Sequence, residues 1–227
     1  MYFLENKIGR DFFNQKTLTV AKKLLGKYLV RNYGGKLLIG KIVETEAYIG
    51  PKDKASHCYA KKIQKESFKI KIIKRNFYKI SRFINNKKNF LRRILRCKLC
   101  KVTDRNLAEY LKGGHIYIYL IYGIHYQLNI TTFKEGFPEC VLIRSLEPIL
   151  NLNNPKGPGR VCKELYLDNH FWGHDVVNSK KIWLIDGESI PDKEIAKKKR
   201  IGIDYAEEYI NKLWRFYIKN NKWVSVK

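Results

Sequence analysis

Residues 40–57 read GKIVETEAYIGPKDKASH, and the rest of the chain is best understood from this stretch. Its first half alternates like a half-buried β-strand, so the two glutamates of ETE and Tyr48 fall on one side of the pleat. The turn residues Gly50 and Pro51 then direct a polar loop that brings His57 back toward the strand end. Two carboxylates, a tyrosine and a histidine at one strand end predict a pocket rather than a packing pattern.

Strand and turn patterns on both sides of this stretch predict an antiparallel sheet. Residues 28–33 and 36–48 have the pattern of two strands joined by a hairpin turn at Gly34 and Gly35. Alternation and turn signals predict further strands, which are 115–122, 124–132, 140–146, 182–185 and a closing hairpin of 214–218 with 223–226. We therefore expect an α+β fold with a curved, mostly antiparallel sheet and flanking helices.

Three segments have helical patterns, which are 17–25, the residues from the turn at 156–160 through 165, and 205–213. In the first, Thr17 is available as the N-cap and Gly26 as the stop, and Asp204 is the expected cap of the last. The second follows the glycine-rich basic sequence KGPGR. Whether the free amides of that sequence bind a phosphate or form an ordinary turn stays open.

The chain has 227 residues and a formal net charge of +25. This length suits one hydrophobic core, so we expect a single domain over residues 1–227. A charge so far from zero predicts a polyanionic partner, which is either nucleic acid or an acidic membrane surface.

The charge is concentrated in one segment. Residues 61–101 hold 16 lysines and arginines against one acid, Glu66, and include the low-complexity run NNKKN at 85–89. Apolar residues recur only loosely there, so we interpret residues 61–102 as an insertion that is helical in part at most and could be mobile. It is either a disordered expansion that adds affinity for phosphates or a helical element that clamps DNA or a partner.

The five cysteines are widely scattered in a chain too large to need disulfides, so we expect free thiols in a reducing compartment. Cys97 and Cys100 form a lone CxxC. Without a second pair at ligand spacing this is weak evidence for zinc, and two incidental thiols are the favoured interpretation.

Several functional classes have no signal in the sequence. The first 13 residues lack the apolar core of a secretory signal, and no apolar run approaches the ~20 residues of a membrane span. We therefore expect a soluble protein that is not secreted and does not enter a membrane. There is also no HExxH, Walker or GxGxxG motif, so we expect neither a metal nor a cofactor.

Arg144 lies in an otherwise apolar predicted strand and shares a face with Leu142. A guanidinium there is costly to bury without a carboxylate, so Glu44 or Glu46 is the expected partner of Arg144. The alternative for Glu46 is a solvated carboxylate at the edge of the sheet. Tyrosines and a histidine suit stacking on a planar base, a carboxylate suits activation of water, and a basic body suits a phosphate backbone. Hydrolysis of a base–sugar bond needs only these groups.

The sequence resembles the alkyladenine (3-methyladenine) DNA glycosylases, which remove alkylated and deaminated purines from DNA. The signature is ETEAY followed by a YxxYG strand and an RxLEP strand. The matching pieces are collinear and cover nearly the whole chain outside the insertion; they are LLGKYLVR at 24–31, VETEAYIGPKDKASH at 43–57, DRN at 104–106, IYIYLIYGIHYQLNI at 116–130, CVLIRSLEP at 140–148, KGPGRVCKEL at 156–165, RIGI at 200–203 and RFYIKNNKWVSV at 215–226.

This resemblance implies roles for the residues around the pocket. Glu46 is similar to the general base that orients and deprotonates the attacking water, and Arg144 to the residue that helps hold this water and carboxylate. Tyr48 and His57 match the pair that packs one face of the flipped base, and Tyr119 matches the aromatic residue on the other face. The resemblance therefore implies a purine pocket at the end of the ETEAY strand.

Three further residues complete the expected site. Asn129 matches the side chain that obstructs the 2-amino group of guanine, and Leu142 is expected to contact the base. Tyr122 matches the side chain that enters the minor groove and fills the gap left by the extruded nucleotide. The sequence departs from the family pattern in the length of the insertion and at Glu109 and Tyr110, where family members commonly have apolar residues near DNA.

The implied function is a base-excision-repair enzyme that flips alkylated or deaminated purines out of double-stranded DNA and leaves an abasic site. No lysine is assigned as a nucleophile, so we expect a monofunctional enzyme. We also expect a monomer, located in the nucleus or another DNA-containing compartment. Two alternatives stay open. One is a catalytically inactive nucleic-acid-binding module on the same fold, and the other is membrane binding through the basic insertion.

Overall fold

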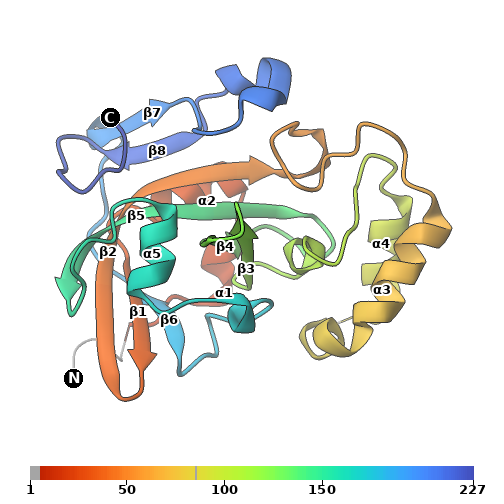
Figure 1. The fold of residues 1–227 in the computed structure, drawn as a ribbon, viewed down its shortest axis with the longest axis horizontal. Helices are drawn as coiled ribbons and strands as arrows, with labels where there is room; N and C mark the ends of the chain where they lie inside the picture. Colours follow the sequence, from red (N-terminus) through yellow and green to blue (C-terminus); the bar gives the residue numbers. More distant parts are fainter. Residues whose placement is uncertain (1–5, 85) are drawn as a thin grey trace.

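One long strand, β2 (Lys36–Ile49), runs through the centre of the fold (Figure 1). In the computed structural model, which describes residues 6–84 and 86–227, eight strands form a sheet in the order β3-β4-β5-β2-β1-β6, with β8 pairing to β2 and to β7. The strand pairs are antiparallel, which confirms the expected α+β fold. The other strands are β1 (Tyr28–Tyr33), β3 (Ile116–Ile121), β4 (His125–Thr131), β5 (Glu139–Leu150), β6 (Ile182–Ile185), β7 (Ile195–Lys198) and β8 (Arg215–Ile218).

The length of β2 lets it pair with two strands along one edge. Its first residues pair with β1, Glu44 to Glu46 pair with β8, and β5 follows the other edge. The register with β5 shifts on both sides of Glu44 and then places Glu46 opposite Leu142. Such an irregularity bends a strand locally, so the ETE segment lies where the C-terminal strands reach the sheet.

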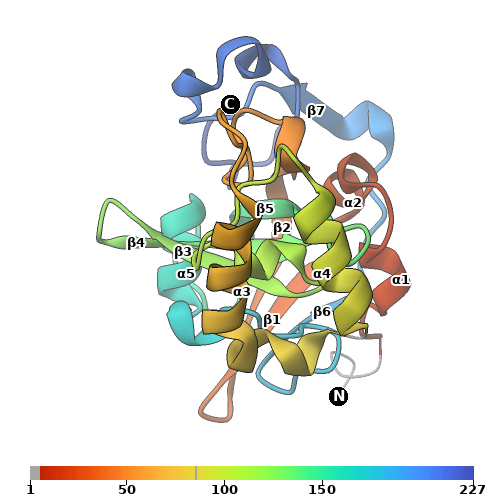
Figure 2. The same ribbon diagram turned by 90° about the vertical axis from the view of Figure 1, so that its right-hand side faces the viewer.

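Helices cover both faces of the sheet, as Figures 1 and 2 show. α1 (Arg10–Phe13) and α2 (Thr17–Lys23) lie behind the strands in Figure 1, and α5 (Pro158–Glu164) lies in front of them. Buried aliphatic side chains of α2, α5 and the strands form the main core. In the part of the chain that the structure describes, no helix has the length and apolar composition needed to cross a membrane.

The expected cap of the first helix was wrong. Lys16 is the N-cap of α2, and no side chain caps the helix there. Thr17 is already helical and buried, and its Oγ1 lies 2.8 Å from Thr132 Oγ1. A hydroxyl that pairs with another segment of the chain cannot also satisfy the first amides of its own helix.

The insertion is more ordered than its composition predicted. It forms two helices, α3 (Glu66–Ile80) and α4 (Lys87–Arg96), which lie side by side in Figure 2. Their buried aliphatic and aromatic side chains join a second core; they are Ile72, Ile73, Ile80, Phe90 and Ile94. The segment is helical in part, as expected, and its apolar residues recur closely enough to bury one face of each helix. Residues 1–5 of the N-terminal segment and Asn85 of the low-complexity run lie outside the described residues.

The CxxC at the end of α4 is also different from the expectation. Cys97 and Cys100 form a disulfide, so the prediction of free thiols was wrong for this pair. The chain turns here, with the Cys100 amide donating to the Cys97 carbonyl at 3.2 Å, and the turn brings the two side chains together. The remaining cysteines are buried free thiols; they are Cys58, Cys140 and Cys162.

The C-terminal part corrects two further expectations. A 3-10 segment, Asp204–Asn211, replaces the predicted α-helix, with Ile203 at its N-cap position and a break at Glu207, where φ is 51°. The predicted closing hairpin does not form. Instead β8 pairs with β2 and β7, and the residues at 223–226 form loop contacts, including a Ser225 amide that donates to Glu44.

Candidate active site

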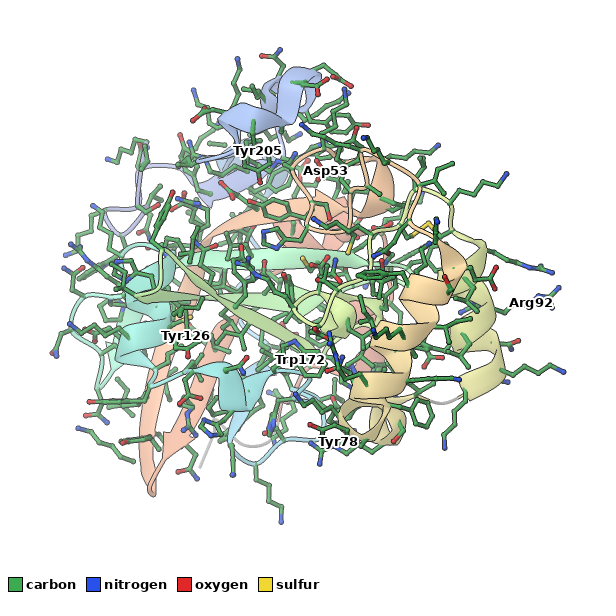
Figure 3. The ribbon with its side chains drawn as sticks, turned by 45° about the vertical axis from the view of Figure 1, so that its right-hand side comes forward. Asp53, Tyr78, Arg92, Tyr126, Trp172 and Tyr205 are labelled. Carbon is green, nitrogen blue, oxygen red and sulfur yellow. A yellow bond between two sulfur atoms is a disulfide. The ribbon has the colours of Figure 1, made fainter. Side chains whose placement is uncertain are left out.

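A cavity of about 1430 Å³ lies between the β3–β4 hairpin, the loop after β2 and residues 201–205. Figure 3 labels Asp53 and Tyr205 in its upper part, where these last two segments meet and the Tyr205 hydroxyl donates to the Ala55 carbonyl. The cavity is lined by seven of the residues singled out from the sequence, which are Tyr48, His57, Tyr119, Tyr122, Asn129, Leu142 and Arg144. Four neighbouring strands, the loop after β2 and the turn of the β3–β4 hairpin therefore supply these residues.

Glu46 lies directly behind this lining and is fully buried. Its Oε1 accepts from the Ile201 amide at 2.9 Å and lies 3.2 Å from Arg144 Nη1. Its Oε2 accepts from the Tyr48 hydroxyl at 2.9 Å. A carboxylate offers about four acceptor positions, so these three contacts leave one position on Oε2 for a further donor.

Glu44 is equally buried but has a different set of partners. Its Oε1 accepts from Arg144 Nε at 3.1 Å and from Arg215 Nη1 at 2.9 Å, and its Oε2 accepts from the Ser225 amide at 2.7 Å. These contacts join β2 to β5, β8 and the C-terminal loop. Glu44 therefore connects strands, whereas Glu46 faces the cavity wall.

Arg144 links the two carboxylates. Burial alone would lower the pKa of its guanidinium, but the neighbouring charges of Glu46 and Glu44 outweigh burial and raise that pKa. The arginine is thus held as a cation beside both acids, which is the arrangement that a buried guanidinium requires.

Tyr48 is held from two sides. Its hydroxyl donates to Glu46, and the Arg200 guanidinium lies over its ring, 4.7 Å from the centroid. Arg200 in turn forms a fully buried ion pair with Asp53, at 2.6 Å between Nη1 and Oδ2. Burial and the charge of Glu46 raise the pKa of the Tyr48 hydroxyl well above its ordinary value, so it stays a donor at neutral pH.

The aromatic walls are arranged differently from the sequence-based expectation. The rings of His57 and Tyr119 contact each other edge to face, with centroids 4.7 Å apart, which leaves no space for a base between them. The structure therefore places His57 against Tyr119, whereas the expectation from the sequence grouped it with Tyr48. His57 and Tyr119 form one wall, and Arg105 lies over the ring of Tyr119 at 4.5 Å.

His57 is neutral under ordinary conditions. Burial, assisted by the positive charges of Arg105 and Lys101, lowers its pKa to about 4. Its Nδ1 lies 2.7 Å from the Tyr117 hydroxyl. A neutral imidazole bonded in this way suits contact with a base rather than general acid catalysis at neutral pH.

The last wall comes from β4 and β5. Asn129 and Leu142 are paired residues of these strands, and each is almost fully buried beneath the cavity. The Asn129 side-chain amide donates to the Gln127 carbonyl at 3.4 Å, which fixes its position.

Tyr122 occupies the tip of the β3–β4 hairpin. Its side chain is 87% exposed, and its φ of 52° lies in the left-handed region that non-glycine residues rarely adopt. A large aromatic side chain held out into solvent on a constrained turn contributes little to the packing of the described part of the chain.

Basic side chains extend the cavity toward the insertion. Lysines and an arginine from the loop after β2 and from both ends of the insertion line its opening; they are Lys54, Lys61, Lys62, Lys101 and Arg105. Within residues 6–84 and 86–227, no group of three or more His, Cys, Asp or Glu side chains is placed to hold a metal ion.

Sequence reasoning missed the residues that hold the site in place. Neither the Ile201 amide on Glu46 nor the Arg200–Asp53 ion pair was assigned a role, although RIGI at 200–203 and the loop at 50–57 both belong to matched pieces. The signal that could have located the ion pair is Arg200 beside the turn residue Gly202. A buried arginine requires a carboxylate, and Asp53 is the acid of the loop at 50–57. Arg215, which joins Arg144 on Glu44, was missed as well.

Comparison with known proteins agrees with this geometry. A family model described as methylpurine-DNA glycosylase matches residues 11–71 and 97–222, so residues 72–96 of the insertion lie outside the match. Among curated bacterial relatives named for an inferred 3-methyladenine DNA glycosylase activity, one from Natranaerobius thermophilus is 37% identical over 97% of this chain and 99% of its own length. One from Clostridium perfringens is 38% identical over 97% of this chain and 100% of its own length. One from Borreliella burgdorferi is 39% identical over 96% of this chain and 99% of its own length. Bacteria have no nucleus, so these relatives give no support to the expected nuclear location.

Proposed function

The chain belongs to the methylpurine-DNA glycosylase family of hydrolases acting on N-glycosyl bonds, and we propose that it excises alkylated or deaminated purines from double-stranded DNA. The substrates are 3-methyladenine, hypoxanthine and ethenoadenine. The product is an intact abasic site, because the proposal assigns water activated by Glu46, and no lysine, as the nucleophile. The protein acts as a monomer in a compartment that contains DNA.

The observation that carries this proposal is the set of contacts around Glu46. Three donors from three parts of the chain orient this carboxylate, and one acceptor position on Oε2 stays free beside the cavity. A water bound there would face the sugar of a nucleotide whose base fills the cavity. Glu46 would deprotonate that water as it attacks, and its negative charge would stabilise the oxocarbenium-like cation that develops on the sugar.

The walls of the cavity suit an extruded purine. The base would lie between Tyr48 on one side and His57 with Tyr119 on the other, a sandwich that accepts any planar ring. Asn129 beneath the base would obstruct a 2-amino group and so disfavour guanine. Leu142, opposite Glu46 in the sheet, would supply an apolar contact near the reacting bond.

Tyr122 would enter the DNA while the nucleotide swings out. Its exposed ring on the hairpin tip is suited to fill the gap between neighbouring base pairs in the minor groove. Damage weakens pairing and lowers the few kcal/mol that extrusion costs, so damaged purines reach the cavity more readily than normal ones. Basic side chains around the cavity opening and on the insertion would bind the phosphates.

A nucleic-acid-binding module with an inactive pocket is the second candidate. The contacts around Glu46 argue against it, because burying a carboxylate beside an arginine is costly and binding alone does not require it. The same reasoning disfavours membrane binding through the insertion, which would not need the cavity.

The test is an excision assay on duplex oligonucleotides that carry hypoxanthine, ethenoadenine or 3-methyladenine. We expect release of the free base and a DNA strand that breaks only after alkali treatment. Absence of excision on all three substrates by a protein that binds duplex DNA would favour the inactive module. Strand breakage without alkali would contradict the monofunctional mechanism.

A further inference from the structure

Arg105 lies at the opening of the cavity, and the mechanism above gives its charge no part in the choice of base. Its guanidinium carbon is 4.5 Å from the centroid of the Tyr119 ring, and its Nη2 donates to the Leu120 carbonyl at 3.0 Å. The Arg105 carbonyl accepts from the Trp172 indole at 3.1 Å. Arg105 is therefore held by its backbone and by its side chain beside an aromatic wall of the cavity, which it also lines.

The charge of Arg105 differs from that of the other arginines beside the cavity. Arg144 and Arg200 each form ion pairs with buried acids. Among the residues that the structure describes, no carboxylate forms an ion pair with Arg105, and the side-chain hydrogen bond of Arg105 goes to a neutral carbonyl. A cation without a paired acid keeps its effect on charged groups that enter the cavity.

We propose that Arg105 is a specificity-determining residue that favours neutral damaged purines over purines that carry a positive charge. Its guanidinium would repel a cationic base at the Tyr119 wall and would stabilise the negative charge that any departing base acquires. The inference rests on the proposed glycosylase function, and its test distinguishes the failure of one from the failure of the other.

The proposed substrates fall into two charge classes. Hypoxanthine and ethenoadenine are neutral in the nucleotide, whereas the methyl group on N3 gives 3-methyladenine a positive charge. In both classes the electron pair of the C1′–N9 bond moves to the base, the water oxygen bonds to C1′, and the water proton passes to Glu46. A neutral base then leaves as an anion that takes a proton from solvent, and 3-methyladenine leaves as a neutral molecule. The two classes therefore differ by one unit of charge in the bound state and in the transition state alike.

Arg105 is close enough to act on the base. A purine stacked on Tyr119 can have its centre about 4.5 Å from the centre of that ring, and the guanidinium carbon is 4.5 Å from the same point. The two are then separated by no more than about 9 Å, whichever face of the ring each occupies. With an effective dielectric constant of about 20, one unit of charge at this distance is worth roughly ten- to twentyfold. Arg105 is exposed, so solvent screening brings the expected effect toward the lower value.

This cation has two separate consequences for the reaction. It lowers the barrier from the bound state for both classes, because negative charge moves onto the base as the bond breaks. It also makes the bound state and the transition state of the cationic base less favourable relative to free substrate. The value of kcat/KM for 3-methyladenine is thereby lowered relative to that for a neutral base.

The test is a competition assay with limiting protein and two duplexes of one sequence, of which one carries hypoxanthine and the other 3-methyladenine. The ratio of the released bases gives the ratio of the two kcat/KM values, from which equal changes in duplex binding cancel. We expect Arg105→Gln to shift this ratio about tenfold toward 3-methyladenine. Arg105→Lys keeps the charge, so its ratio should stay within about twofold of that of the unmodified protein.

Two controls separate the local charge of Arg105 from other effects. The competition ratio for hypoxanthine against ethenoadenine, which are both neutral, should be the same in Arg105→Gln as in the unmodified protein. Arg92→Gln removes the same charge from an exposed position on α4 outside the cavity lining. It should not change the ratio of hypoxanthine to 3-methyladenine.

An unchanged ratio of hypoxanthine to 3-methyladenine in Arg105→Gln would overturn the inference and leave Arg105 as a contact to phosphates. An equal shift in Arg105→Lys or in Arg92→Gln would also overturn it, since the effect would then come from packing on Tyr119 or from net charge. A changed ratio between the two neutral bases would do the same. Absence of excision from every duplex by the unmodified protein would instead contradict the proposed function, and this inference with it.

Discussion

The cavity and the insertion use charge in opposite ways. Around the cavity, three buried acids are paired with arginines: Glu44 with two arginines, Glu46 with Arg144, and Asp53 with Arg200. In the insertion, 16 basic residues stand against one acid, and most of them lie in solvent, as Arg92 of α4 does in Figure 3. The first region fixes the positions of a few atoms, and the second supplies a positive field.

This contrast separates chemistry from affinity. The family match covers the residues of the cavity and leaves out 72–96, which are most of α3 and all of α4. Hydrolysis depends on sub-ångström placement of a carboxylate, whereas attraction of a phosphate backbone depends on summed charge. Substitutions in the two regions should therefore fail in different assays.

The largest expected effect is on catalysis. Glu46→Gln keeps the size of the side chain and removes the base, so single-turnover excision of hypoxanthine should fall by about 10²–10⁴-fold. Binding of the same duplex, measured by fluorescence anisotropy, should be retained. An excision rate near that of the unmodified protein would place the chemistry elsewhere and remove the basis of the comparison.

Glu44→Gln should instead act on stability. This carboxylate accepts from Arg144, Arg215 and the Ser225 amide, so its neutralisation leaves buried positive charge without compensation. We expect a loss of about 3–5 kcal/mol in the free energy of unfolding, measured with denaturant. A variant as stable as the unmodified protein would mean that Glu44 has no structural role.

A smaller effect concerns Glu109 and pH. Between its ordinary value of 4.5 and the raised pKa of about 8, the folded protein holds a proton that the unfolded chain releases. Stability should therefore fall as pH rises through this window. Relative to Glu109→Gln, the unmodified protein should lose about 1.4 kcal/mol for each pH unit. Parallel stability profiles of the two proteins would show that Glu109 ionises normally.

The smallest effect is expected from single charges of the insertion. Lys71 and Lys74 are both exposed on α3, and their joint replacement, Lys71→Gln with Lys74→Gln, should weaken duplex binding a few-fold. The slope of log affinity against log salt concentration should become less steep by about 0.9 for each phosphate that the variant no longer neutralises. The matched control is Lys193→Gln with Lys198→Gln, two exposed lysines before and within β7. An equal effect of both pairs would mean that net charge, and not the insertion, governs affinity.

The sequence was most informative where patterning and burial agree. β1, β2 and β6 follow the expected bounds within one residue, because alternating or wholly apolar runs bounded by turn residues leave few other conformations. The family resemblance read from ETEAY, YxxYG and RxLEP was confirmed by the comparisons. The candidate residues it identified come together around one cavity, although their roles stay predictions.

Contacts between distant segments could not be predicted. For the insertion, the sequence left a disordered expansion and a helical element open, because lysine and asparagine between the apolar residues hid a face that is buried in one cluster with Leu107 and Tyr110. The disulfide depends on how the chain turns after α4, and the His57–Tyr119 wall depends on how a loop folds against β3. Short strands such as β7, with the sequence IAKK, carry no alternating pattern long enough to recognise.

The division between chemistry and affinity is tested most directly by one single-turnover experiment on a hypoxanthine duplex at saturating protein. It compares the unmodified protein, the variant with Lys71→Gln and Lys74→Gln, and Glu46→Gln. We predict that the lysine variant needs more protein to saturate but then cleaves within about twofold of the unmodified rate, whereas Glu46→Gln saturates normally and cleaves at least about 10²-fold more slowly. A lysine variant that stays slow when fully bound, or a Glu46→Gln variant that cleaves normally, would contradict the account.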